Sequence, residues 1–444
     1  MPRLHSFAIT LMACGLIGSQ AVPELRAEGA IAWNAPPELI DGPSFWAVRW
    51  YDRQDAQNAP IAVTRRLRIN GPEAASDERW RDRQETHDTG LALIGSGVNL
   101  AHIAHAEIYA ELWGGHPGVH RKTVALNGRV TLPMPEVGAQ WGNCVYSYPS
   151  VATPVSALVR ETNALQWGLD SGDTFWGHAM ADQVALRLAL SAEGAHALAP
   201  ARSTWRPELA IERDAERDGF RMRLVEPAPS EVWHRVTFLG YYRGYDDDGD
   251  GAERGWHGFT KDRKPVNTLG VSVTAPHIGF WDTSLLPAQE NVAIRALIEW
   301  DDGFAMLSEP VRGLRIPPRA GASVRLFRPQ SLPVPFWSRA GNERTCDIPL
   351  DVDPSSIEAA TLYLKIWTGG PGTVEAPITL NGHRLPLGHG HEHHVDFQAI
   401  ALDPSWLQRG ANKIRVLSDT THHGIEVFLP GPAIMARIRE TETP

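Results

Sequence analysis

One segment of this chain occurs twice, and this duplication constrains the fold more than any other feature of the sequence. Residues 106–129 read AEIYAELWGGHPGVHRKTVALNGR and residues 360–383 read ATLYLKIWTGGPGTVEAPITLNGH, with nine of the 24 aligned positions identical. A weaker similarity follows in each copy, between residues 158–170 and 407–419. The copies lie about 250 residues apart, which is much wider than the period of a solenoid repeat. We therefore expect one type of domain used twice, with a different domain between the copies.

The composition indicates an all-β protein. The 444 residues favour about three domains, and 43% apolar with 21% charged residues is typical of a globular chain. The 40 Gly, 34 Pro and 16 Trp residues favour short strands joined by tight turns. The net charge of −10 argues against a basic surface for nucleic acid or an anionic membrane.

Both copies carry the same hairpin signal. The apolar stretches 124–126 and 378–380 each run into Asn-Gly, at Asn127 and Asn381. Asn-Gly favours a type I′ turn, because both central residues of that turn need positive φ. We expect these asparagines to be explained by their turns, and Trp113 and Trp367 to be equivalent, mostly buried core residues.

The N-terminus predicts export. An apolar run from Phe7 to Gly18 follows Met-Pro-Arg, and Ser19-Gln20-Ala21 fits a small-x-small cleavage site, so residues 1–21 are expected to be a signal peptide. Alternatively, Cys14 in Leu-Met-Ala-Cys resembles a lipoprotein box and would be lipidated. Either way, the mature chain is expected outside the cytoplasm of a bacterium, with no transmembrane segment. Cys144 and Cys346 are expected to be two buried thiols rather than a disulfide.

The order of elements in each copy resembles the galactose-binding-like β-sandwich, a jelly roll that is common as a carbohydrate-binding module. In the second copy the resemblance rests on Asn381, Gly382, Asp403, Leu407, Gly410, Asn412, Ile414 and Val416. The first copy departs from the pattern, with Glu161 where the second has Gly410. The resemblance implies two jelly-roll domains, over residues 30–195 and 318–440.

Residues 230–316 resemble a bacterial immunoglobulin-like or fibronectin type III domain. The resemblance rests on HRVTFLGYY (234–242), APHIGFWDTS (275–284) and VAIRALIEWDDG (292–303). Residues 196–229, rich in Ala, Pro and charge, are expected to be a linker. The whole chain also resembles an uncharacterised group of secreted bacterial proteins, which implies no activity.

The strongest candidate site is an acidic loop. Asp246, Asp248 and Asp250 occupy alternate positions before Gly251, which matches the first half of a calcium-binding loop. The twelfth position of that loop holds His257 instead of the bidentate Glu of an EF-hand. Carboxylates this close repel one another unless a cation or solvent screens them. The two interpretations are a calcium site and a solvated hairpin tip.

A histidine cluster is the second candidate. It comprises His389, His391, His393, His394, His422 and His423. Neutral imidazoles suit zinc or copper, so one or two residues of the first group could bind a metal together with His422 or His423, with Asp419 orienting a ring. The alternative is a set of surface and packing histidines. The His and Met ligands that jelly-roll copper monooxygenases use are absent.

Two loop tryptophans, Trp141 and Trp176, are candidates for stacking on sugar rings. Catalytic residues remain unknown, since GxSxG, HExxH and Cys-His motifs are missing. The sequence therefore favours a secreted or cell-surface protein that binds carbohydrate or scaffolds an extracellular polymer, with a calcium-stabilised loop. The alternative functions are a metal-dependent extracellular enzyme, an oxygenase or a polysaccharide-processing hydrolase, that uses the histidines, and a purely structural envelope protein.

Overall fold

The computed structural model describes residues 32–52, 66–74, 76–116, 118–136, 144–170, 176–225, 235–386 and 394–440. Strands dominate these ranges and neighbouring strands pair antiparallel, so the expected all-β class is confirmed. None of the helices in the described part of the chain has the length and apolarity needed to cross a bilayer. The expected signal peptide and Cys14 lie outside the described residues.

The two copies of the repeat form four-stranded sheets with the same strand order. In the first copy the strand order is β3–β9–β5–β6, and in the second it is β24–β29–β26–β27. The first sheet contains β3 (Leu91–Gly95), β5 (His120–Leu126), β6 (Val130–Pro133) and β9 (Thr162–Asp170). The second contains β24 (Arg344–Leu350), β26 (Ile378–Leu380), β27 (His383–Arg384) and β29 (Gly410–Val416).

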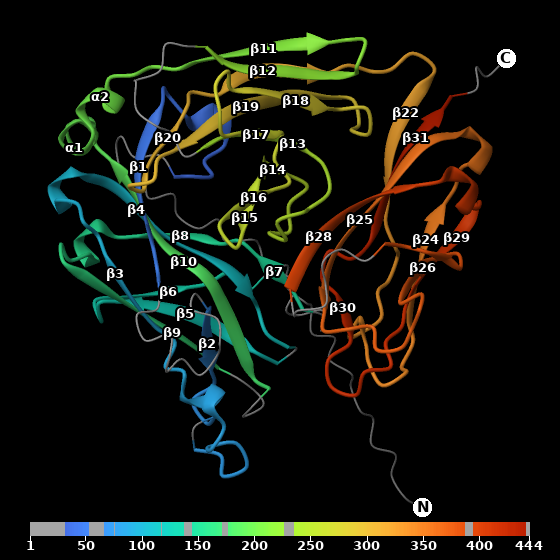
Figure 1. Cartoon of the computed structure of the whole chain (residues 1–444), viewed down its shortest axis with the longest axis horizontal. Coiled ribbons are helices and arrows are strands. Elements are labelled where there is room, and N and C mark those ends of the chain that lie inside the picture. Colours follow the sequence, from blue (N-terminus) through green and yellow to red (C-terminus); the bar gives the residue numbers. More distant parts are fainter. Residues whose placement is uncertain are drawn as a thin grey trace, which may run out of the picture. The chain divides into compact units, whose positions relative to one another are not determined.

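A second layer completes each sandwich and is again equivalent in the two copies. In the first copy β4 (Ile103–Trp113) pairs with β10 (His178–Leu190), β8 (Ser150–Thr153) and β7 (Tyr146–Ser147). In the second, β25 (Ile357–Thr368) pairs with β31 (Ala433–Arg439), β28 (His394–Leu402) and β30 (Ile425–Val427). The outer strands are β1 (Ser44–Trp50) and β2 (Arg66–Asn70) on β10, and β22 (Ala322–Phe327) on β31. Figure 1 shows the two layers of the second copy as the orange and red strands.

Both Asn-Gly hairpins form as predicted, and the asparagines have a second role. Asn127 and Asn381 adopt φ values of 52° and 51°. Their side-chain amides donate to the side-chain Oδ1 atoms of Asn163 and Asn412, respectively, each at 2.9 Å. Asn163 and Asn412 are completely buried. Each turn is therefore tied to the neighbouring strand, β9 or β29, by a pair of side chains that the hairpin signal alone does not reveal.

In the described residues, the segment expected to be a linker forms helices and strands instead. Residues 196–229 contain the end of α1 (Ala192–Leu198), α2 (Pro200–Ser203), β11 (Glu208–Asp214) and β12 (Gly219–Val225). β12 pairs with β18 (Ile278–Asp282), and its residues Phe220, Met222 and Leu224 are buried in the core. The intervening Arg221 and Arg223 point to solvent. The charged residues of this alternating strand made the segment look like a linker, although every second residue is apolar and buried.

We call residues 235–316 the middle segment. Most of its strands belong to a second sheet, which packs against this three-stranded sheet. Its strands are β13 (Arg235–Arg243), β14 (Arg254–His257), β17 (Gly270–Ser272), β19 (Gln289–Glu299), β20 (Phe304–Leu307) and β21 (Val311–Ile316). β20 pairs both with β19 and with β1. One twelve-stranded sheet therefore runs from the middle segment into the first copy.

The two tryptophans of the repeat share one environment, whereas the two cysteines lie in different clusters. Trp113 and Trp367 occupy equivalent, largely covered positions, as expected, but both pack on one small cluster outside the sandwich cores, formed by Cys144, Tyr146, Val395 and Phe428. The expectation of core tryptophans was wrong, because period-2 alternation defines two strand faces without saying which one is covered. Cys144 and Cys346 are free, buried thiols, as expected.

Candidate functional site

The outer face of the repeated strand is where each copy contacts the rest of the protein. On β4, Ile108 and Leu112 are in the sandwich core, whereas Tyr109 and Glu111 contact the hairpin of β15 (Phe259–Lys261) and β16 (Lys264–Val266). The Tyr109 hydroxyl lies 3.0 Å from Oγ1 of Thr260. The outward positions of the first copy thus hold one loop of the middle segment.

The equivalent residues of β25 hold a second loop of the middle segment. Tyr363, at the position of Tyr109, stacks on Tyr245 with ring centroids 5.5 Å apart. Lys365, at the position of Glu111, is completely buried next to the acidic loop. The two copies therefore place opposite charges at one repeat position, and each charge faces the middle segment.

Glu111 is a buried carboxylate that caps the β15–β16 turn. It accepts hydrogen bonds from the backbone N–H of Asp262 at 3.0 Å and from the Thr260 hydroxyl at 3.2 Å. Lys261 Nζ lies 3.7 Å away. Burial raises the pKa of Glu111 to about 7, so this anchor titrates near neutral pH.

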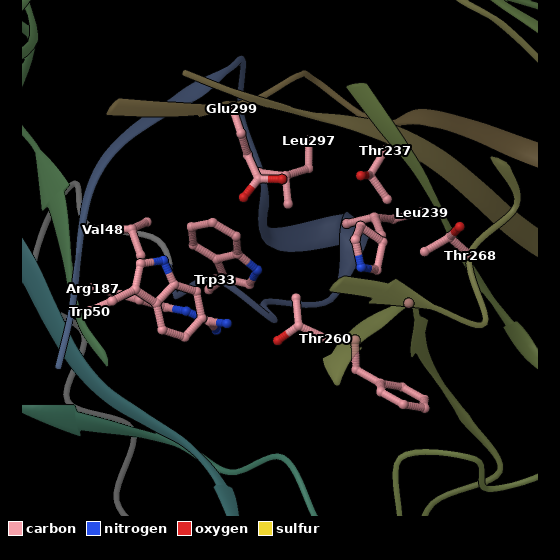
Figure 2. A pocket seen from close by; sticks show the side chains of 13 residues that line it. Trp33, Val48, Trp50, Arg187, Thr237, Leu239, Thr260, Thr268, Leu297 and Glu299 are labelled. Atoms are coloured by element: carbon pink, nitrogen blue, oxygen red, sulfur yellow. The ribbon is translucent and has the colours of Figure 1, made fainter. Parts of the chain in front are cut away.

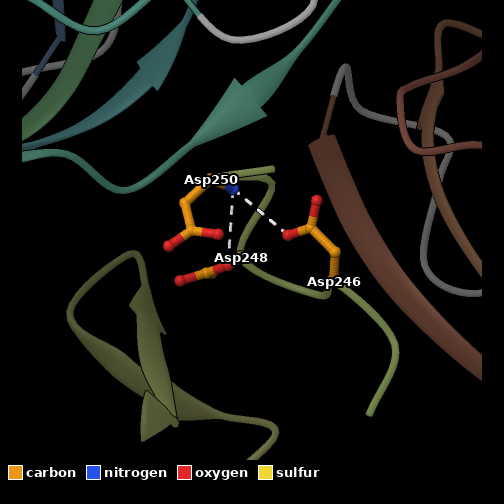
Figure 3. A group of neighbouring side chains, drawn as sticks. All are labelled: Asp246, Asp248 and Asp250. Atoms are coloured by element: carbon orange, nitrogen blue, oxygen red, sulfur yellow. Dashed lines mark hydrogen bonds between the residues drawn. The ribbon is translucent and has the colours of Figure 1, made fainter. Parts of the chain in front are cut away.

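The acidic loop after β13 gathers its carboxylates as the sequence predicted. Asp246, Asp248 and Asp250 each place one carboxylate oxygen within 4.8 Å of the others, and Figure 3 shows the three side chains converging. Asp246 accepts hydrogen bonds from the backbone N–H of Gly249 (2.9 Å), Asp250 (3.1 Å) and Gly251 (3.1 Å). These bonds fix the loop around its first carboxylate.

His257, at the twelfth position, supplies a positive charge to this loop instead of a ligand. Its Nδ1 lies 2.9 Å from the Asp247 carboxylate and its Nε2 lies 3.1 Å from the carbonyl oxygen of Tyr242. Both partners are acceptors, so a ring that satisfies both must carry two protons. Burial lowers the pKa of His257, but attraction to Asp247 and their hydrogen bond outweigh it and raise the pKa overall.

Lys365 is the second positive charge at the loop. Its Nζ donates to the carbonyl oxygen of Tyr146, in the first copy, at 2.7 Å. The loop approaches so closely that a Cβ atom at Gly249 would lie 2.7 Å from that oxygen and 3.0 Å from Lys365 Nζ. Burial lowers the pKa of Lys365 to about 8. Burial, together with repulsion by Asp247, Asp250 and Asp246, raises the pKa of Asp248 to about 8.

The charges around the loop do not cancel. The groups that act on one another there are the four carboxylates of residues 246–248 and 250 and the two cations Lys365 and His257. Four negative and two positive charges leave a net charge of −2 when all are ionised. That deficit equals the charge of one divalent cation, and it lies where Tyr146 of the first copy, the middle segment and Lys365 of the second copy meet.

We expect the melting temperature of the calcium-free protein to fall as the pH rises from about 5 to 8. The folded-state pKa values of Asp248 (about 8), Glu111 and Glu426 (both about 7) lie above the ordinary values of 3.8 and 4.5. The folded state therefore binds more protons than the unfolded state, and stability present below the ordinary pKa values is lost as the pH rises through the raised ones. Lys365, whose pKa is lowered, adds stability only above about pH 8. Thermal scans in EGTA at pH 5, 6, 7 and 8 measure this; a flat or rising series contradicts it.

The histidine site stays a prediction. His389, His391 and His393 lie outside the described residues, and nothing is described for the side chain of His394. His422 and His423 are exposed. The expected orienting residue Asp419 accepts hydrogen bonds from the backbone and hydroxyl of Thr373. Within the described ranges, the carboxylates of the acidic loop are the one group of three or more side chains arranged to hold a metal ion.

Of the two loop tryptophans, Trp141 lies outside the described residues and Trp176 is 53% exposed. The residues that sequence reasoning missed are Lys365, Glu111 and the charged role of His257. A signal for the first two was present, since each is the charged residue within an otherwise apolar and aromatic stretch, residues 108–113 and 362–367. Their alignment at one repeat position could have identified them.

Comparisons with known proteins give only distant similarities. No protein-family model matches the chain, and no curated protein matches it. Among solved structures, the chain is similar to BuGH86wt in complex with neoagarooctaose, with 10% identity, a TM-score of 0.23, and coverage of 52% of this chain and 34% of that chain. It is also similar to BpGH86A, a β-porphyranase of glycoside hydrolase family 86 from the human gut bacterium Bacteroides plebeius (11% identity, TM-score 0.22, 53% and 36% coverage).

A third similar structure is the exo-β-1,3-galactanase Pc1,3Gal43A E208Q from Phanerochaete chrysosporium with β-1,3-galactotriose (9% identity, TM-score 0.17, 66% and 64% coverage). The chain spans about a third of the length of BuGH86wt and BpGH86A. All three TM-scores lie below 0.5, so we base the function on the residues of this chain.

Proposed function

We propose that the protein is an exported carbohydrate-binding or scaffolding protein. A calcium ion bound by Asp246, Asp248 and Asp250 would stabilise the contacts between its two repeat copies and the middle segment. The observation that carries the proposal is the convergence of these three carboxylates where four carboxylates face the two cations Lys365 and His257. Four carboxylates that remain close together without a further cation would repel one another at neutral pH.

The donor set favours calcium over the other common metals. All three candidate ligands are carboxylate oxygens, which suit hard cations rather than zinc or copper. Calcium accepts six to eight oxygens in flexible geometry, so backbone carbonyls and water can supply the remainder. Magnesium requires a nearly ideal octahedron and releases its water reluctantly.

The position of the loop supports a structural role for the proposed calcium ion. The Tyr245 hydroxyl donates to the carbonyl oxygen of Gly431 at 2.6 Å, and Gly249 approaches Tyr146 and Lys365. An ion held here would stabilise contacts that involve all three parts of the chain. A stiffened junction suits a protein that presents binding surfaces to an extended polymer.

Calcium at about 100 times its Kd should stabilise the folded state by about 2.7 kcal/mol, which raises the melting temperature by roughly 3 °C in a chain of this size. Asp248→Asn should abolish this rise, because it removes one ligand charge. The same substitution should raise the melting temperature in EGTA, since it relieves repulsion by Asp247 and Asp250. Differential scanning calorimetry in EGTA and in CaCl2 at pH 7.5 measures both effects.

The matched control is Asp41→Asn, which removes an exposed carboxylate outside the loop and should keep the full response to calcium. Magnesium at the same concentration should give a smaller rise. An Asp248→Asn protein that responds to calcium as strongly as the wild type would show that the loop is only a solvated turn.

A further inference from the structure

Strand β3 lies at the edge of the first copy's four-stranded sheet, and one side of its backbone is unpaired. Among the described residues, β3 pairs with β9 and with no other strand. Gly90 and Ser96, which flank β3, each make a backbone hydrogen bond to β9 or to the residue before it. Because the direction of hydrogen bonding alternates along an antiparallel strand, the residues between them direct their N–H and C=O groups to the open edge at every second position. These residues are Leu91, Leu93 and Gly95.

The side chains that β3 presents to solvent are apolar. Leu91 is 37% exposed and Leu93 is 55% exposed, whereas Ala92 and Ile94 lie in the sandwich core. Residues 89–101 contain no charged side chain. The outward positions beside them on β9 and β5 are uncharged as well; they are Thr123, Ala125, Thr162, Ala164, Gln166 and Gly168.

β3 and β24 are equivalent strands whose registers can be matched residue by residue. Ile94 lies opposite Asn163, and Ile348 lies opposite Asn412. In each copy the side-chain amide of the asparagine donates to the backbone carbonyl oxygen of the isoleucine at 3.4 Å. The two sheet edges can therefore be compared position by position.

The second copy protects the positions that the first copy leaves unprotected. Leu93 corresponds to Asp347, and Gly95 corresponds to Pro349. Asp347 and Pro349 are both exposed. A carboxylate on an edge strand disfavours the approach of another strand, and proline has no N–H to donate to one. Of these two equivalent edges, β3 is therefore the one that is open to strand pairing.

We propose that two copies of this protein associate through β3, with the two strands antiparallel about a two-fold axis at Leu93. The strand is self-complementary in this register, because Leu93 lies opposite its own copy, Ala92 lies opposite Ile94, and Leu91 lies opposite Gly95. No like charges meet at this edge, although the net charge of −10 on each molecule makes the two repel elsewhere. A two-fold contact is closed, so association stops at the dimer.

The contact is small, so the dimer is expected to form only at high protein concentration. Five strand residues span roughly 17 Å, and two such strands bury less than the roughly 1,200 Å² at which stable interfaces begin. Backbone hydrogen bonds across the edge and the paired leucines supply the attraction. The dimer would present two copies of any binding surface to an extended polymer, but it depends neither on calcium nor on a carbohydrate ligand.

The test places opposite charges at Leu93. Sedimentation velocity of the full chain, from about 1 μM to about 1 mM, gives the Kd of the dimer. Leu93→Asp and Leu93→Lys each bring two like charges together across the axis and should weaken association at least tenfold. An equimolar mixture of the two variants should restore association, because opposite charges then meet. Leu93 is more than half exposed, so both variants should keep the melting temperature of the wild type.

The matched control is Leu39→Asp, which adds the same charge at a 57% exposed leucine outside the sheets and should leave Kd unchanged. A wild type that stays monomeric at the highest concentration overturns the proposal. A dimer that Leu93→Asp does not weaken also overturns it, since that dimer must use another surface. Loss of association in both variants without recovery in their mixture overturns the two-fold pairing at Leu93.

Discussion

Replacing Lys365 with methionine is expected to destabilise the calcium-free protein by about 3–5 kcal/mol at pH 7, the range found when one member of a buried charge group is removed. Lys365 is completely buried, and its loss leaves the carboxylates of the acidic loop with His257 as their remaining cation. It also removes the 2.7 Å hydrogen bond to the carbonyl oxygen of Tyr146. Thermal and urea unfolding in EGTA measure the loss.

Calcium should restore much of this stability, because the ion then balances the carboxylates that Lys365 no longer faces. Asp248→Asn should restore part of it without calcium, and the double variant measures the coupling of the two side chains. Lys413→Met, which alters an exposed lysine of β29, is the matched control and should change stability by less than about 0.5 kcal/mol. A Lys365→Met protein as stable as the wild type in EGTA would show that the junction does not depend on charge balance.

The second large effect is expected at the two buried asparagines. Asn163→Ala and Asn412→Ala should each destabilise the protein by about 3 kcal/mol, since each leaves several buried backbone groups without a hydrogen-bond partner. Asn412 accepts from the backbone N–H of Gln408 and donates to the carbonyl oxygens of Gln408 and Gly410. Asn163 makes equivalent bonds to both backbone groups of Val159. Urea unfolding followed by tryptophan fluorescence measures the two losses.

The two losses should agree within about 1 kcal/mol, because the same network recurs in both copies. Asn342→Ala, at an exposed position, controls for the substitution itself and should have little effect. A large effect in one copy and none in the other would mean that the duplicated sheets no longer share this stabilising contact.

Features that depend on local spacing could be predicted from the sequence. The repeat predicted two equivalent sheets, and their strand orders agree. Asn-Gly predicted both hairpins, because positive φ at Asn127 and Asn381 is a property of a few adjacent residues. The alternate carboxylates of Asp246, Asp248 and Asp250 converge for the same reason, since the turn that gathers them lies within the loop itself.

Which strand faces are covered, and which distant residues meet, could not be predicted in this way, because both depend on how the sheets pack. Alternation along β4 and β25 separates two faces, but only the neighbouring sheets determine that Trp113 and Trp367 pack outside their cores. Lys365 reaches the acidic loop from more than a hundred residues further along the chain. Trp33 and Glu299, far apart in the chain, line one pocket for the same reason (Figure 2). Such contacts arise because burial of apolar surface is non-directional, so a linear pattern shows that a face will be buried without naming what buries it.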